Sequence, residues 1–143
     1  MSKSKIRTKP AIFQGQELPG YRVDADGNIW STKRDDFRMM NPYVPNQTLA
    51  KVKYPSVTLQ ILNSRRTFKV HRIVAETLIK IPLPNGFRKS TWKRLNDAER
   101  RLIMQLMEVN HIDHDATNYH PSNLEWITRF ENLQKSYSHY YSR

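Results

Sequence analysis

Five residues near the C-terminal end of the chain could together hydrolyse a phosphodiester bond. They are Asn110, His111, Asn118, Asn123 and Asn132. A histidine with an unperturbed pKa of roughly 6.5 is largely neutral near neutral pH and can take a proton from an attacking water. Carboxamide oxygens, such as those of Asn110 and Asn132, are hard ligands that suit Mg²⁺. A base beside oxygen ligands favours metal-assisted cleavage of a phosphodiester.

A zinc site is a weaker interpretation of the same region. His111, His114 and His120 lie close in sequence, but they fall on a polar loop without a helical period to support them, and the chain contains no cysteine. Asp113 and Asp115 are nearby carboxylates. Acids in loops more often form turns or remain solvated than bind a metal, and we expect that of both.

Two strands and a helix must position these residues. We predict strands over Val109–Ile112 and Leu124–Ile127, joined by a polar loop over Asp113–Ser122. The run Thr128–Glu131 has the pattern of a capping box, and it predicts a helix whose first turns contain Asn132. This arrangement can bring the histidine of the first strand opposite the asparagine of the helix.

The preceding part of the chain predicts two hairpins and a helix. Tyr21–Trp30 reads as a hairpin whose turn contains Asp26-Gly27. Ser56–Ile61 and Thr67–Val70 read as a second hairpin with a basic turn over Asn63–Arg66. Apolar residues at helical spacing then predict a helix from His71 to about Lys80, whose apolar stripe covers the sheet.

Less regular segments separate these elements. Residues 39–54 contain Pro42 and Pro45 and are followed by Pro55, so we expect this segment to be irregular. We also expect Pro82–Trp92 to form a loop. Asn96 with Glu99 predicts the capped start of a helix over about 97–107. Its expected apolar face is Ala98, Leu102, Ile103, Leu106 and Met107.

The composition favours a nucleic-acid partner. Among 143 residues, 24 Lys and Arg oppose 13 Asp and Glu, so the formal net charge is +11 and the pI is near 10.1. Such a charge attracts a polyanion through counterion release. The basic residues are spread along the chain and no apolar run is long enough to cross a bilayer, which argues against a membrane-bound protein. Without cysteine the chain has no disulfide and no thiolate metal site, as expected of a cytoplasmic protein.

The chain resembles the HNH nucleases, also called ββα-metal or His-Me finger enzymes, in the form found in phage and homing endonucleases. The resemblance rests on four segments. They are Val70-His71-Arg72-Ile73-Val74-Ala75-Glu76, Val109-Asn110-His111-Ile112-Asp113, Asn123-Leu124-Glu125-Trp126-Ile127-Thr128 and Glu131-Asn132, with Asn118 between them. It extends over roughly residues 20–138, and residues 21–31 look like the small β-module that often precedes this nuclease.

The resemblance implies a role for each site residue. His111 is the expected general base, and Asn132 a metal ligand in the third motif position. Asn123 would tie down the loop and orient the histidine. Asn110 stands where several relatives carry an aspartate ligand, and a neutral carboxamide there predicts weak binding of Mg²⁺ or Mn²⁺. The expected activity is cleavage of double-stranded DNA, by a monomer that nicks or a homodimer that cuts both strands.

The resemblance also implies a fold and a DNA-binding surface. We expect an α+β protein with a basic flexible tail over 1–19, a β-rich DNA-binding module over 20–70 and an HNH module over 71–143 that contains the helix at about 97–107. The origin implied is a phage or mobile element acting in the cytoplasm of a bacterial host. The candidate DNA contacts are Arg65, Arg66, Lys69, Arg72, Lys93 and Arg94.

Two other function classes remain. A catalytically inactive DNA-binding protein on the same fold predicts salt-sensitive binding without metal-dependent cleavage. A ribosomal or other RNA-binding protein explains the charge, but it gives no reason for the spacing of Asn110, His111, Asn123 and Asn132. His71 reads as a structural hydrogen-bonding residue between strand and helix more readily than as a catalytic one.

Overall fold

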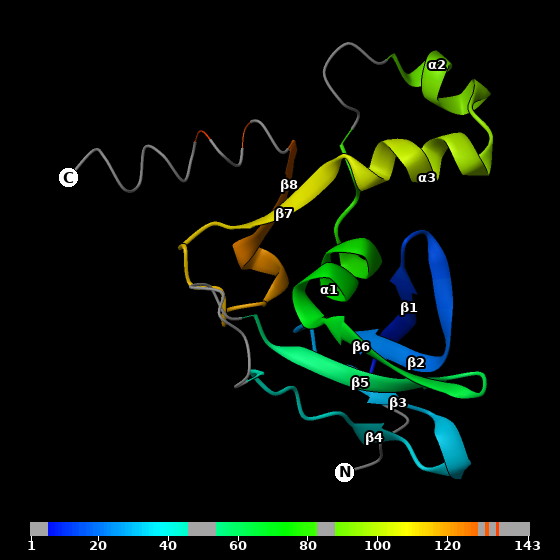
Figure 1. Cartoon of the computed structure of the whole chain (residues 1–143), viewed down its shortest axis with the longest axis vertical. Helices are drawn as coiled ribbons and strands as arrows, with labels where there is room; N and C mark the ends of the chain where they lie inside the picture. The colour runs from blue at the N-terminus through cyan, green and yellow to red at the C-terminus, as the bar shows by residue number, and fades with distance from the viewer. Residues whose placement is uncertain (1–5, 46–53, 83–87, 129–130, 132–133, 135–143) are drawn as a thin grey trace.

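In the described part of the chain, three antiparallel sheets meet around one helix, α1 (Val70–Leu78), which lies at the centre (Figure 1). This computed structural model describes residues 6–45, 54–82, 88–128, 131 and 134. The helix packs against β1 and β2 of the first sheet, β6 of the second and both strands of the third. The predicted α+β class is confirmed.

The first sheet contains four strands in sequence order. They are β1 (Thr8–Phe13), β2 (Gln16–Asp24), β3 (Ile29–Ser31) and β4 (Arg38–Met39). The prediction of a loose tail was therefore wrong from residue 8 onward, while residues 1–5 lie outside the described residues. Ala11 is fully buried, and the backbone N–H of Ile12 donates to Thr77 Oγ1 of α1 at 2.9 Å. These contacts with distant residues order a segment that has no apolar period of its own.

The predicted turn between β2 and β3 is confirmed, and one carboxylate organises it. Asp24 accepts hydrogen bonds from the backbone N–H groups of Asp26 and Asn28, from the Asn28 amide and from Trp30 Nε1. Burial raises the pKa of Asp24, but these hydrogen bonds outweigh it and hold the pKa below its ordinary value. Gly27 has a φ of +86°, which favours glycine.

The same turn touches the second half of the chain. A Cβ on Gly27 would lie 3.1 Å from the carbonyl oxygen of Tyr119 and 3.3 Å from Pro121 Cδ and Val74 Cγ1. Only a glycine leaves room for this close approach. The turn between β2 and β3 is thus packed against the loop that precedes β8.

The second hairpin consists of β5 (Ser56–Ile61) and β6 (Ser64–Lys69). Ile61 pairs with Ser64, so the turn is the two residues between them, and the predicted turn over 63–66 was wrong for residues 64–66. The adjacent helix α1 begins at Val70, one residue before the predicted start. Its buried face confirms the predicted apolar stripe.

Two further helices follow α1 in the sequence, before the third sheet. The expected loop over 82–92 is a helix from Lys89, α2 (Lys89–Arg94), and residues 83–87 lie outside the described residues. Helix α3 (Asp97–Gln105) begins with the predicted reciprocal capping box of Asn96 and Glu99. Two members of the expected apolar face, Leu102 and Leu106, are 65% and 66% exposed, because the helix lies at the edge of the molecule, whereas Met107 is buried and belongs to the next strand.

The third sheet is the predicted pair of strands, β7 (Met107–His111) and β8 (Leu124–Thr128). His111 pairs with Leu124 and Asn110 with Glu125. The connecting loop ends in a short 3-10 helix, η3 (Pro121–Asn123). After β8, the backbone N–H of Glu131 donates to Thr128 Oγ1 at 3.2 Å, as in the predicted cap.

The buried core draws on all three sheets. Its fully buried members include Val23 and Ile29 of the first sheet, Leu59 of β5 and Ile73 of α1. Helix α1 belongs to the second predicted module by sequence but packs on the first sheet. The predicted boundary between two modules at residue 70 therefore stays a prediction. No helix in the described ranges is long and apolar enough to span a membrane.

Candidate functional site

His111 ends β7 and is buried beside two other rings, those of His71 and Tyr54, which also contact each other. Only 6% of the residue is exposed. Its ring centroid lies 4.9 Å from that of His71, at the start of α1, and 5.7 Å from that of Tyr54. His111 Nε2 and His71 Nδ1 are both buried without a hydrogen-bond partner among the described residues. Such unpartnered polar atoms are rare in native proteins and concentrate where a substrate, ion or water completes the site.

The surroundings keep both histidines neutral. Burial lowers the pKa of His111, and the carboxylates of Asp113 and Asp115 oppose that shift without reversing it. Burial, together with the nearby His111, Lys69 and Arg72, lowers the pKa of His71 to about 3. A neutral imidazole at His111 has a nitrogen that can accept a proton near pH 7.

Asn123 fixes the loop that follows His111. Its Oδ1 accepts from the backbone N–H of Asp113 at 3.0 Å, and its Nδ2 donates to Asp113 Oδ1 and to the carbonyl oxygen of Asn118, both at 2.9 Å. The backbone carbonyl of Asn123 accepts from Ile112 N–H at 2.8 Å. The loop is thereby closed on itself directly beyond the histidine.

Asn110, next to His111, is held by a carboxylate of the neighbouring strand. Asn110 Nδ2 donates to Glu125 Oε1 at 2.8 Å, and Asn110 is 9% exposed. The bond uses the amide nitrogen, so it leaves the carboxamide oxygen as the group available to a cation. Hard oxygen donors of this kind fit Mg²⁺ or Mn²⁺. The cross-strand carboxylate also supplies negative charge beside this neutral carboxamide.

The two acidic side chains of the loop stabilise its turns. Asp113 and Asp115 accept hydrogen bonds within the loop, from Asn118 and Asn123 and from Thr117. In the part of the chain that the structure describes, no three His, Cys, Asp or Glu side chains are grouped to hold a metal. Asn132, the predicted ligand on the third element, lies outside the described residues.

The structure gives Arg72 a role other than the predicted DNA contact. Its guanidinium donates to the carbonyl oxygens of Met107 at 2.9 Å and Met104 at 3.3 Å, and pairs with Glu76 at 3.2 Å. It also lies 4.8 Å from the ring centroid of Trp126. Because the side chain is occupied inside the protein, it joins α1 to the start of β7.

Arg65 and three basic residues that sequence reasoning passed over line one groove. The groove has a volume of about 750 Å³ and lies between the first sheet and the β5–β6 hairpin, where Tyr21 Oη accepts from Gln60 N–H at 2.8 Å. The additional basic residues are Lys33, Arg34 and Arg38. Lys33 and Arg34 begin a short 3-10 helix, η2 (Lys33–Asp35), after β3. Their signal in the sequence was the basic run after the first hairpin.

The remaining predicted DNA contacts are exposed but dispersed. Arg66 lies over the ring of Phe68, and Lys69 lies 4.9 Å from the ring centroid of Tyr54, beside the two histidines. Lys93 and Arg94 lie on α2. Sequence reasoning also missed Glu125 and Tyr54, whose places become evident only from the strand register and from the packing around His111.

Comparison with known proteins agrees with this geometry. Residues 68–134 match the family model described as HNH endonuclease. A solved structure described as "DNA binding and cleavage by the HNH homing endonuclease I-HmuI" is similar in fold, with a TM-score of 0.58 and 22% sequence identity. The match covers 94% of this chain and 59% of that chain, so this chain spans less than two thirds of the other's length. No curated protein matches the chain.

The matched segment contains both strands of the third sheet, the loop between them and the buried histidine at its start. The segment that resembles an HNH endonuclease by sequence is therefore the segment that holds His111, Asn123 and the strand pair around them.

Proposed function

We propose that this protein is a metal-dependent endonuclease that hydrolyses phosphodiester bonds in double-stranded DNA. The observation that carries the proposal is His111, a buried and neutral histidine with an unpartnered ring nitrogen, next to a carboxamide held by Glu125. The match of residues 68–134 to the HNH endonuclease model and the net charge of +11 support it.

Each site residue has a distinct task in this proposal. His111 takes a proton from the attacking water. Asn123 holds the loop through its bonds to Asp113 and Asn118, which keeps the backbone beyond the histidine in one conformation. His71 and Tyr54 pack against the base and exclude bulk water from it.

Asn110 and Asn132 are the proposed ligands of a divalent cation, Mg²⁺ or Mn²⁺. When bound, such a cation stabilises negative charge on the scissile phosphate. Glu125 orients Asn110 through the amide nitrogen. With neutral ligands on the protein, we expect the affinity for the cation alone to be weak and to rise when DNA supplies phosphate oxygens.

The proposed DNA surface includes the basic groove lined by Lys33, Arg34, Arg38 and Arg65. Arg66 and Lys69 continue along β6 from this groove toward the histidines. Phosphate contacts of this kind position the duplex without reading its sequence. One active site per chain cuts one strand, so a monomer would nick and a homodimer could cut both.

Cleavage of supercoiled plasmid tests the proposal. Wild-type protein with Mg²⁺ or Mn²⁺ is expected to produce nicked or linear DNA, and His111→Ala or EDTA is expected to abolish it. The matched control is His114→Asn in the same loop, because His114 is exposed and has a φ of +62° that asparagine tolerates. The control should retain cleavage, and far-UV circular dichroism should show that all variants are folded.

A catalytically inactive DNA-binding protein is the competing function. It is favoured by Asn110, which places a neutral group where several family members carry an acidic ligand. If the wild type retards DNA in a salt-sensitive way but cuts plasmid in neither metal, this function replaces the nuclease. If His111→Ala cuts as well as the wild type, the assignment of the base is wrong.

A further inference from the structure

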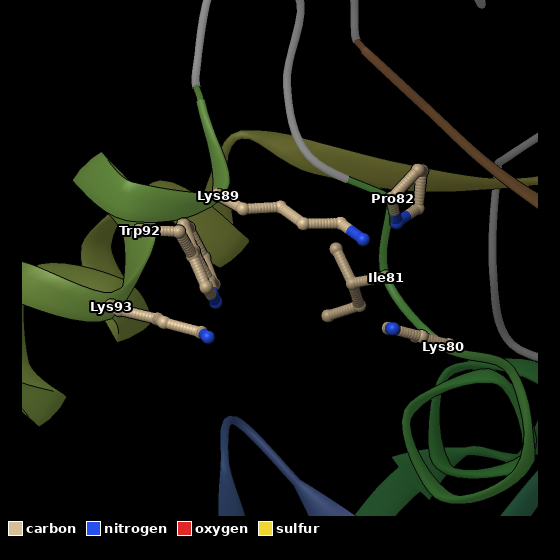
Figure 2. A pocket seen from close by; sticks show the side chains of 6 residues that line it. All are labelled: Lys80, Ile81, Pro82, Lys89, Trp92 and Lys93. Atoms are coloured by element: carbon tan, nitrogen blue, oxygen red, sulfur yellow. The ribbon is translucent and has the colours of Figure 1, made fainter.

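A second pocket lies away from the histidines, between α2 and the segment that follows α1. Figure 2 shows Lys89, Trp92 and Lys93 extending from α2 toward Ile81 and Pro82 on the facing segment. Lys80 completes the lining. The volume is about 630 Å³, within the range of roughly 300–1,000 Å³ that small-molecule sites occupy.

Trp92 is fixed so that its ring can serve as a wall of this pocket. Arg100 of α3 donates from Nε to the carbonyl oxygen of Trp92 and from Nη2 to that of Lys93, both at 3.2 Å. The same guanidinium lies 5.9 Å from the centroid of the Trp92 ring. Because Arg100 both anchors the backbone and contacts the ring, the indole is held in place while part of it lines the pocket.

The charge around this ring has one sign. The lining contains three lysines and no acidic residue. Among the described residues, none of these lysines has an ion pair with a carboxylate. Ile81 and Pro82 provide an apolar wall, so the pocket combines an aromatic ring, an apolar surface and three cationic groups.

We propose that this pocket binds an unpaired nucleotide of the DNA substrate, with the base against Trp92 and the adjoining phosphates near the lysines. An aromatic ring offers a base a stacking partner, and lysines neutralise the backbone on either side of it. A base inside a duplex is already stacked on both faces, so the pocket selects a base that is bulged, gapped or at a single-stranded end. This inference rests on the proposed function, because it takes DNA as the partner.

Binding measured in EDTA tests the pocket without cleavage. The probes are a fully paired duplex and the same duplex with one bulged 2-aminopurine, each followed by fluorescence anisotropy at fixed salt. Base–aromatic stacking contributes about 1–3 kcal/mol, so the wild type should bind the bulged probe about 5- to 150-fold more tightly than the paired one. The 2-aminopurine emission should also fall on binding as its base stacks.

Variants separate stacking from general attraction. Trp92→Ala should remove the preference for the bulged probe and the change in emission, while Trp92→Phe should keep most of both. Thr91→Ala is the matched control, because Thr91 is exposed on the same helix and does not line the pocket. Thermal unfolding of each variant shows whether the fold is retained.

Several results would overturn the inference. The preference could persist in Trp92→Ala, or Trp92→Ala could weaken both probes equally. Displacement of the bulged probe by deoxyadenosine monophosphate as readily as by unlabelled bulged DNA would assign the pocket to free nucleotides instead. Equal binding of the two probes by the wild type refutes this inference alone, whereas failure to bind either probe refutes the proposed function as well.

Discussion

Replacing Asn110 by aspartate should make the protein less stable without metal and better at binding it. Asn110 Nδ2 donates to Glu125 Oε1 at 2.8 Å. In Asn110→Asp, the donor is lost and two carboxylates face each other across the strands. Two unit charges about 4 Å apart repel by roughly 4 kcal/mol at an effective dielectric of about 20, and uptake of a shared proton reduces that cost.

We therefore expect the unfolding free energy of Asn110→Asp to fall by about 2–4 kcal/mol at pH 8 in EDTA. Repulsion raises the folded-state pKa of the pair above its unfolded value of about 4. The loss should thus be small well below pH 4, where the carboxyl groups are protonated in both the folded and the unfolded state, and should grow as the pH rises. For a chain of this length it corresponds to a fall in melting temperature of about 5–15 °C.

Differential scanning fluorimetry against pH and Mg²⁺ measures both effects. Mg²⁺ should raise the melting temperature of Asn110→Asp more than that of the wild type, because the added charge draws the cation into the site. Asn110→Ala is the control, since it removes the same hydrogen bond without adding a carboxylate. If Asn110→Asp is as stable as the wild type at pH 8 and gains no larger shift from Mg²⁺, the assignment of this strand pair to a cation site is refuted.

Three further predictions concern single residues. Arg72→Met should lower the unfolding free energy by about 3 kcal/mol in denaturant titrations, because it leaves Glu76 without its cation; lost DNA affinity with unchanged stability would restore Arg72 as a DNA contact. Asp24→Ala should cost about 2–4 kcal/mol at pH 7, because four hydrogen bonds to the carboxylate are lost. The pKa of Asp24 is lower in the folded than in the unfolded state. The difference in urea midpoint between the wild type and Asp24→Ala should therefore be complete above pH 4 and should shrink as the pH falls through the folded-state pKa. Burial lowers the pKa of His111, so most of the His111 side chain should still be neutral at pH 6.5. The acid limb of the plasmid-cleavage profile should therefore have its midpoint below pH 6.5.

Local patterns were sufficient to predict many of the helices and strands. Alternation in β5, helical spacing in α1 and the capping box at Asn96 each reflect neighbours in sequence, and each element lies close to where these patterns place it. β1 was not predictable in the same way. It is ordered by pairing with β2 and by a hydrogen bond to Thr77, more than 60 residues away.

The residues of the candidate site were likewise predictable only where a local sequence motif contained them. The sequence motif identified His111 and Asn123, but the partners that surround them come from other parts of the fold. Glu125 reaches Asn110 only through the register of β7 and β8, and Tyr54 reaches His111 only through tertiary packing. For Arg72 the sequence suggested a DNA contact that the fold does not favour. A basic residue that follows a basic strand is expected to be exposed, and only the folded structure shows that its guanidinium donates to backbone carbonyl groups.

The close approach of Gly27 to Tyr119 bears on how the segment that precedes the matched module can be exchanged. A recombination event that joined a new N-terminal segment at the start of the matched module would delete the turn that supports the loop beyond His111. The new segment would have to supply a turn with a glycine at that point, or the loop would lose this packing contact. Chimaeras that keep residues 24–27 should therefore survive such exchanges more often than chimaeras cut at the module boundary.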